Sequence, residues 1–394
     1  MSNRDARLPE RLAGVRDRLP DEESFTSPLH STRTAAILGI ALGIAFTTCF
    51  LTGLVSHAHQ HPPSWFALPS RPAGLYRISQ SLHVATGIAS IPLLLAKLWT
   101  VFPLFWKRPA VAGVAHALER LSLIPLVAGS VFLLFTGTIN IAYWYSPMTF
   151  FFTAGHYWAA WLTIGALIVH VSAKSSITRL ALSARAPDAV VPAGAGLGRR
   201  GFLATIAATA GALTLATVGQ TIGPLRRLSV LAPRLPDRGP QGYPVNRAFS
   251  AAGIAAEDVD AGRFTLTVDG NVAEPLRLTL EDLRQLPQYE TTLPIQCVEG
   301  WSYSARWRGV RVRDLLAQAG ADQGAQATVE SLQRGGIYRT SPLNRDQAHD
   351  RDTLLALELD GEPLALDHGF PLRLIAPNRP GVQQTKWINK VVVS

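Results

Sequence analysis

The chain has 394 residues, which exceeds the usual size of one domain and predicts two or three units. Hydrophobic residues make up 47% and charged residues 16%, a balance that excludes wholesale disorder and is too apolar for an ordinary soluble protein of this length. The two cysteines form no CxxC pattern, and the formal net charge of +9 suits either nucleic-acid binding or the loops of a membrane protein.

Long apolar runs predict membrane-spanning helices. The run from Thr34 to Ser56 contains no charged residue and is long enough to cross a hydrocarbon layer of about 30 Å. Similar runs follow at residues 76–105, 121–145 and 155–173, and a shorter one spans 201–222. Any single run could be a buried helix of a soluble protein, but the first four together predict a membrane bundle.

The distribution of basic residues predicts a cytoplasmic N-terminus. Lys and Arg are frequent in the tail 1–32, in the loop with Lys107 and Arg120, and in the segment 174–200, whereas the alternate loops hold few. Five crossings then place the chain after Pro224 outside the cytoplasm. Because the basic residues are explained in this way, we expect membrane lipid and no nucleic acid as a partner.

A twin arginine, Arg199 and Arg200, precedes the fifth apolar run and is followed by Phe202 and Leu203. The arrangement resembles a twin-arginine export signal, here internal. Two arginines that only obey the positive-inside rule are an equally weighted alternative. The export interpretation implies that the domain behind the signal folds around a cofactor before it crosses.

The remaining chain is divided by composition. Residues 224–261 are rich in Pro and Gly and predict a linker, after which short alternating runs such as Tyr289–Gln296 predict strands. Thr279 and Asp282 predict the cap of one short helix, 280–286. Further strands are expected at 264–268, 328–332, 355–359, 372–376 and 387–393. The predicted architecture is multi-domain: a cytoplasmic tail (1–32), an all-α four-helix membrane domain (33–175), a cytoplasmic loop (176–200), a fifth transmembrane helix (201–223), the linker (224–261) and a β-rich α+β domain (262–394).

Histidines inside the apolar runs are candidate haem ligands. His156 and His170 are fourteen residues apart, which on a helix returns to within about 40° of one face at a separation of about 21 Å. This geometry suits one ligand to each of two stacked haems, and His83 matches the depth of His156. For His170 the candidate partners are His30, which is preferred, and His116. Histidines that hydrogen-bond within the bundle or bind quinone directly are the alternative.

Residues 30–175 resemble the cytochrome b subunits of the cytochrome b561 and formate-dehydrogenase or nickel-hydrogenase type. The resemblance rests on the placement of His83 and on the spacing of His156 and His170. It implies one or two b haems and electron exchange with quinone or quinol. The first helix departs from a two-haem pattern because it lacks a histidine inside the span.

The sharpest signal surrounds Cys297, which opens the run Cys-Val-Glu-Gly-Trp-Ser. Trp307-Arg-Gly-Val, Asp360-Gly-Glu-Pro-Leu and His368-Gly-Phe-Pro-Leu-Arg373 follow in order. A lone cysteine after a strand is more often a small buried hydrophobe. Over residues 262–394, however, these motifs are similar to the sulfite oxidase molybdopterin-binding family. The resemblance implies molybdenum held by one pyranopterin dithiolene, with Cys297 as its protein ligand and as a catalytic residue.

The same resemblance implies the roles of six further residues. His368, Arg373, Thr385 and Lys386 match the residues that hold the pterin phosphate, and Arg373 can offer a bidentate fork. Tyr338, a candidate catalytic residue, and Thr340 stand where such domains line the metal pocket. Glu299 occupies a position where sulfite-oxidising members carry basic residues, so sulfite is disfavoured as a substrate.

These features predict a membrane-anchored molybdenum oxidoreductase of the cell membrane. A small molecule or an oxidised side chain reacts outside the cytoplasm by two-electron or oxygen-atom chemistry, and electrons pass through b haem to or from the quinone pool. The alternative is a non-catalytic membrane electron-transfer or partner-binding module, against which the retained Cys297 argues. A transporter with a histidine proton relay is disfavoured because the spans lack acidic residues.

Overall fold

A computed structural model of the chain describes residues 24–63, 65–107, 113–148, 150–183, 197–218, 223–232 and 238–394. Most of the predicted tail (1–23), much of the predicted cytoplasmic loop (184–196), the end of the fifth predicted helix (219–222) and part of the predicted linker (233–237) lie outside these residues. The chain divides into two units. The first comprises 1–50, 86–138 and 146–214, and the second comprises 51–85, 139–145 and 215–394.

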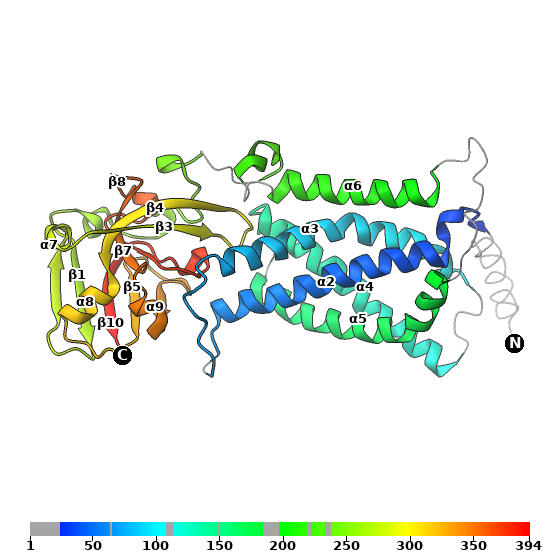
Figure 1. Cartoon of the computed structure of the whole chain (residues 1–394), viewed down its shortest axis with the longest axis horizontal. Coiled ribbons are helices and arrows are strands. Elements are labelled where there is room, and N and C mark those ends of the chain that lie inside the picture. The colour runs from blue at the N-terminus through cyan, green and yellow to red at the C-terminus, as the bar shows by residue number, and fades with distance from the viewer. Residues whose placement is uncertain are drawn as a thin grey trace, which may run out of the picture. The chain divides into compact units, whose positions relative to one another are not determined.

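Among the residues that the structure describes, five helices are long and apolar enough to cross a membrane, in the places that the sequence predicts (Figure 1). They are α2 (Thr32–Gln60), α3 (Leu75–Val101), α4 (Val114–Ile141), α5 (Phe152–Ser183) and α6 (Arg199–Val218). Large apolar side chains such as Ile44, Leu95 and Leu162 are more than half exposed on them. A helix that is apolar on its exposed face as well as its packed face is compatible with a lipid environment.

Small and hydroxyl-bearing residues bring the helices of the first unit into contact. A Cβ added at Gly129 on α4 would lie only 2.2 Å from the Thr163 Oγ1 on α5. The Cys49 Sγ on α2 lies 3.0 Å from the Thr86 Oγ1 on α3. Close approach through such residues is typical of helices that pack in an apolar environment, and it agrees with the predicted bundle.

The second unit contains two five-stranded sheets (Figure 1). In the first sheet, strands β1 and β10 are parallel and every other pair is antiparallel. Its order is β2 (Leu276–Thr279), β1 (Thr265–Gly270), β10 (Ile388–Val393), β5 (Ala327–Ser331) and β6 (Thr340–Leu343). The second sheet is antiparallel and runs β3 (Tyr289–Gln296), β4 (Ser302–Arg311), β7 (Leu354–Leu359) and β8 (Glu362–Pro363), with β9 (Arg373–Ile375) paired to β7.

Three short helices accompany the sheets: α7 (Leu280–Gln285), α8 (Val312–Gln318) and α9 (Arg345–His349). Helix α7 begins with the predicted capping box, in which the Thr279 hydroxyl accepts from the Asp282 amide and the Asp282 carboxylate accepts in return. The predicted β-rich α+β architecture is therefore confirmed. Strand β4 was not predicted, because arginines and a glycine interrupt its apolar pattern; β3 and β7 pair with it on either side.

Candidate functional site

Cys297 follows directly after β3 and opens a tight turn. Its amide donates to the carbonyl of Trp301 (2.9 Å), and its carbonyl accepts from the amide of Gly300 (3.2 Å). Gly300 has a φ of +94°, a conformation that favours glycine over any residue with a Cβ. The segment Cys297–Trp301, here called the cysteine loop, is thereby closed by its own backbone.

A buried cavity unites four of the predicted site residues. Cys297, His368, Arg373 and Lys386 line it together, although 71 or more residues separate Cys297 from the others in sequence. His368 ends the 3-10 turn η9 (Leu366–His368), Arg373 begins β9, and Lys386 precedes β10. The rest of the described lining consists of Pro244, Val245, Asn246, Ile295, Trp301, Tyr303 and Gly381.

The cavity carries buried positive charge. Burial lowers the pKa of Arg373 and lowers that of Lys386 well below its usual range, with Arg373 contributing further to the second shift. Burial and the charge of Arg373 lower the pKa of His368 to about 4. Each shift reports the cost of placing a cation here, and an anion in the cavity offsets that cost.

Neutral acceptors, rather than carboxylates, hold these cations. The Lys386 Nζ donates to the carbonyls of Arg247 and Asp367 (2.9 Å for Asp367), and the Arg373 Nη1 donates to the carbonyl of His368 (3.1 Å). The Arg373 Nε is buried without a hydrogen-bond partner among the described residues. An orphaned guanidinium N–H in such a place is a ready donor to an anion.

Residues 252–394 match the family model described as the oxidoreductase molybdopterin binding domain. Human mitochondrial sulfite oxidase is 33% identical over 172 residues, covering 37% of this chain and 32% of that protein. The "Uncharacterized oxidoreductase YuiH" of Bacillus subtilis is 35% identical over 133 residues, covering 34% of this chain and 66% of the relative. The "Putative protein-methionine-sulfoxide reductase subunit YedZ1" of Azospira oryzae is 34% identical over 137 residues, covering 35% of this chain and 51% of the relative.

Residues 252–394 form a molybdopterin-binding oxidoreductase domain. The expectation of a sulfite oxidase-like, molybdopterin-dependent oxidoreductase is confirmed at this level. The chain spans about a third of the length of sulfite oxidase and about half of the length of the Azospira relative.

The residues of this domain fit an anionic pterin cofactor. Arg373 and Lys386 present N–H donors at the cavity wall. Among the described residues, the hydrogen bonds of Arg373, Lys386 and His368 go to backbone carbonyls and not to carboxylates. The His368 Nε2 donates to the carbonyl of Pro240 (2.8 Å), which orients the imidazole ring. Cys297 provides a thiol on the same cavity. The cavity therefore offers a sulfur ligand for a metal and, separately, nitrogen donors for a phosphate.

The other predicted residues of the molybdopterin domain lie around this cavity rather than in its described lining. Thr385 is buried and its hydroxyl donates to the Ser341 Oγ (2.8 Å). Thr340 is exposed on β6. The Tyr338 hydroxyl donates to the Gln60 Oε1 (2.8 Å), and burial and the nearby Cys297 raise the pKa of this tyrosine. The roles predicted for these three residues stay predictions.

Glu299 lies within the cysteine loop and is buried. Its carboxylate accepts a hydrogen bond from the Trp301 Nε1 (2.8 Å). A buried acidic side chain therefore lies two residues from Cys297, and the expectation against sulfite stays a prediction.

Two aromatic residues of the site were missed from the sequence. Tyr303 lines the cavity, stacks on Tyr243 at 4.5 Å between ring centroids and lies parallel to Trp301. Burial raises the pKa of Tyr303, against the effect of nearby Arg373. The alternation of apolar and polar residues from Tyr303 to Trp307 is the sequence signal that would have placed Tyr303 on the inner face of β4.

The candidate haem ligands lie on helices, and two of them share one local arrangement. The His83 Nδ1 on α3 is 3.2 Å from the Thr52 Oγ1 on α2, and the His156 Nδ1 on α5 is 3.0 Å from the Thr136 Oγ1 on α4. Each imidazole is therefore oriented by a threonine of a neighbouring helix. His83 belongs to the second unit and His156 to the first, so their pairing stays a prediction.

The inner pair of histidines lies in the first unit. His170 shares α5 with His156, and its Nδ1 is buried without a hydrogen-bond partner among the described residues. The His30 Nδ1 lies 3.1 Å from the carbonyl oxygen of Thr100, and its ring lies 4.4 Å from that of Trp99. His116 lies near the start of α4. These positions leave the partner of His170 a prediction.

Proposed function

We propose that the protein is a membrane-anchored molybdenum oxidoreductase that exchanges electrons with the quinone pool through b haem. The observation that carries the proposal is the cavity in which Cys297 meets the buried donors His368, Arg373 and Lys386. A domain that only bound a partner would not need a thiol and three costly buried nitrogen bases on one cavity.

The chain's own residues supply the holding groups. Arg373 and Lys386 bind the pterin phosphate, and the His368 ring, held by its Nε2 bond to the Pro240 carbonyl, lines the same cavity. Cys297 binds the metal through its thiolate. When bound, the molybdenum cofactor supplies two-electron and oxygen-atom chemistry. Trp301 and Tyr303 close the cavity with aromatic surface and keep water from the thiolate.

We propose a sulfoxide as the substrate class, either a small molecule or an oxidised methionine side chain. The name of the Azospira relative refers to protein methionine sulfoxide, and the buried Glu299 carboxylate disfavours the sulfite anion. In the reductive direction the sulfoxide takes two electrons and two protons and yields a thioether and water.

The two threonine–histidine pairs support the haem half of the proposal. A histidine that binds a metal through one ring nitrogen typically has the other nitrogen held by a neighbouring polar group. Thr52 and Thr136 hold the Nδ1 atoms of His83 and His156 in this way. A Cβ added at Gly53 would lie 3.2 Å from the His83 Cε1, so glycine leaves room beside this ring.

Contacts within the second unit support the proposed topology. The loop after α2 contacts the molybdopterin domain through Arg71 with Asp350, and the segment after α4 contacts the preceding linker through Tyr143 with the carbonyl of Asn246. If α2 to α6 each cross once, the loops after α2 and α4 and the chain after α6 share one side. By the positive-inside rule, that side is the one outside the cytoplasm.

Metal analysis and a visible spectrum of the purified full-length chain test the proposal. We expect molybdenum and pterin in near-equal amounts to protein, and a reduced-minus-oxidised b haem spectrum that quinol elicits. A chain with molybdenum but no haem refutes the electron-transfer half. A chain that binds haem and lacks molybdenum and pterin supports the non-catalytic electron-transfer module instead.

A further inference from the structure

The carbonyl after the cysteine is held by side chains of two membrane-length helices. The Val298 carbonyl accepts from the Gln80 Nε2 on α3 (3.1 Å) and from the Asn140 Nδ2 near the end of α4 (3.4 Å). Gln80 is 4% exposed and Asn140 is 7% exposed. All of these residues belong to the second unit. Two buried amides thus converge on the carbonyl of Val298, the residue bonded directly to Cys297.

Gln80 makes this contact at a cost. Its Oε1 is buried without a hydrogen-bond partner among the described residues, so the acceptor capacity of the buried amide is unused. A leucine at this position of an apolar helix avoids that penalty. The contact with Val298 is the feature of the structure that distinguishes glutamine from leucine here.

The same face of α3 packs against the rest of the cysteine loop. A Cβ added at Gly300 would lie 3.1 Å from the Val84 Cγ1, so the absence of a side chain permits this approach. The Arg77 Nη1 also donates to the Ser304 Oγ (3.0 Å), just beyond the loop on β4. Residues 77, 80 and 84 recur at the spacing of one helix face.

The predicted haem ligand His83 stands next to this contact. It is three residues after Gln80, so the two side chains are neighbours on the surface of α3. Its Nδ1 lies 3.2 Å from the Thr52 Oγ1. A continuous path of bonds therefore joins Cys297 to His83. It follows the backbone to Val298, the hydrogen bond from Gln80 to the Val298 carbonyl, and one turn of α3.

We propose that the cysteine loop is the built-in electron contact between the molybdenum site and the haem at His83, and that Gln80 and Asn140 are the positioning residues that hold it. The inference rests on the proposed function. Electron transfer between buried centres weakens steeply with distance and is favoured by bonded and hydrogen-bonded contact. A loop held by two amides keeps that distance short without a mobile carrier.

Each transfer moves one electron and balances without bond changes in the protein. In the reductive direction one ferrous haem becomes ferric as Mo(VI) becomes Mo(V), and a second transfer gives Mo(IV). Quinol supplies the two electrons. In the oxidative direction the same steps run in reverse toward quinone.

The test is flash photolysis of the full-length protein in detergent with a photogenerated one-electron flavin reductant. The flavin reduces the haem, and the haem then re-oxidises as its electron passes to Mo(VI), which the visible spectrum follows without any substrate. The variants are Gln80→Met, Asn140→Leu and the double variant. Gln288→Met is the matched control, because the Gln288 Nε2 also donates to carbonyls, those of Leu283 and Leu286, at the far end of β3.

We expect the double variant to re-oxidise its haem roughly tenfold more slowly than the wild type, with each single variant between the two. Tenfold corresponds to about 1.4 kcal/mol of activation free energy. Molybdenum content, pterin content and the haem spectrum should stay at wild-type level, as should every property of Gln288→Met. Those contents also show that the variants have folded.

An unchanged rate in a double variant that retains both cofactors overturns the electron-contact proposal alone. A slower rate accompanied by an equal loss in Gln288→Met also overturns it, because the effect is then a general one of the domain. A wild-type protein without haem overturns this inference together with the haem half of the proposed function. The presence of haem in the wild-type spectrum separates the last outcome from the first two.

Discussion

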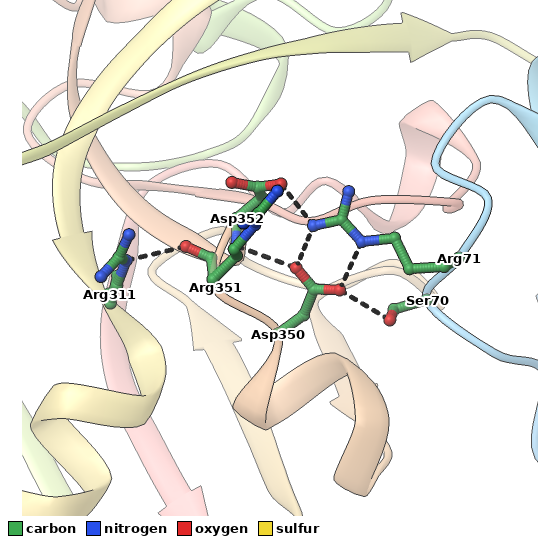
Figure 2. A network of polar contacts seen from close by, with 6 residues as sticks. All are labelled: Ser70, Arg71, Arg311, Asp350, Arg351 and Asp352. Carbon is green, nitrogen blue, oxygen red and sulfur yellow. Dashed lines mark hydrogen bonds and ion pairs between the residues drawn. The ribbon is translucent and has the colours of Figure 1, made fainter.

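The Arg71 guanidinium binds both oxygens of the Asp350 carboxylate, at 2.9 and 2.7 Å, across 279 residues of sequence (Figure 2). It also bonds to Asp352, and the Ser70 hydroxyl donates to Asp350 (2.7 Å). Burial alone raises the pKa of Asp350, but the bonds from Arg71, from the Asp352 amide and from Ser70 outweigh it and hold that pKa below its usual range. This ion-pair clamp therefore persists throughout the physiological pH range, and it weakens only when acid protonates Asp350, below the usual pKa range of an aspartate.

We expect Arg71→Ala to free the loop between α2 and α3. Arg71 is 44% exposed, so solvent screens the pair and the loss in unfolding free energy is about 1 kcal/mol. Limited proteolysis should cut residues 61–74 faster in the variant. Arg351→Ala is the control, because Arg351 is 72% exposed and makes only a 3.9 Å contact with Asp352. Equal proteolysis of both variants and the wild type contradicts the role of the clamp.

Replacement of Cys297 by Ser should abolish turnover while pterin remains bound. The serine hydroxyl is a harder and weaker ligand than a thiolate, whereas Arg373 and Lys386 still hold the phosphate. Pterin content and activity toward a sulfoxide measure the two effects separately. Cys49→Ser is the control, since Cys49 contacts Thr86 within the helices, and it should retain activity. Wild-type turnover in Cys297→Ser refutes the molybdenum site as described.

His83→Ala and His156→Ala should each eliminate the same low-spin haem signal, and His170→Ala should affect a different signal or none. Thr52→Val should retain the haem but weaken its binding by roughly ten- to a hundredfold, because His83 loses the group that orients its ring. Thr48→Val, one turn earlier on α2 with its hydroxyl bonded to the carbonyl of Ile44, is the matched control. A full spectrum in His83→Ala shows that the outer pairing is wrong.

Acidification should destabilise the cofactor-free protein through His368. The folded-state pKa lies near 4 and the unfolded one near 6.5, so the unfolded state binds a proton first. The neutral histidine contributes its full stability above pH 6.5, and that stability declines as the pH falls toward 4, by at most about 3 kcal/mol. Thermal unfolding of the cofactor-free chain measures the decline, and His368→Gln should reduce it. Bound pterin phosphate should also reduce it, since an anion favours the charged imidazole. A decline of the same size in His368→Gln assigns it to other groups.

Conversion of Arg199 and Arg200 to lysines separates the two interpretations of the twin arginine. Both residues begin α6, and Lys-Lys preserves the positive charge while it removes the pair that an export receptor reads. If the pair is an export signal, the molybdopterin domain stays on the cytoplasmic side in the variant. Protease accessibility of the domain in intact spheroplasts reports its side. Unchanged external exposure leaves the arginines only their electrostatic role.

The sequence alone determined the existence of the five long helices, and it predicted the site residues that stand in distinctive motifs. Uncharged runs longer than a bilayer leave few alternatives to helix, and the predicted capping box of Thr279 and Asp282 depends only on residues three apart. Cys297, His368 and Arg373 could be assigned because they stand in runs whose order resembles a known family.

Only the tertiary structure decided what those residues meet. The paired neighbours of β4 give it a strand conformation that its arginines obscure, and Pro244 to Asn246, which read as linker, line the cavity. The hydrogen bonds of Gln80 and Asn140 to Val298 join residues 218 and 158 positions apart. No local pattern encodes such a pair, because the helix propensity of a glutamine or asparagine does not depend on the residue that its side chain faces. The packing of distant segments decides which residue that is.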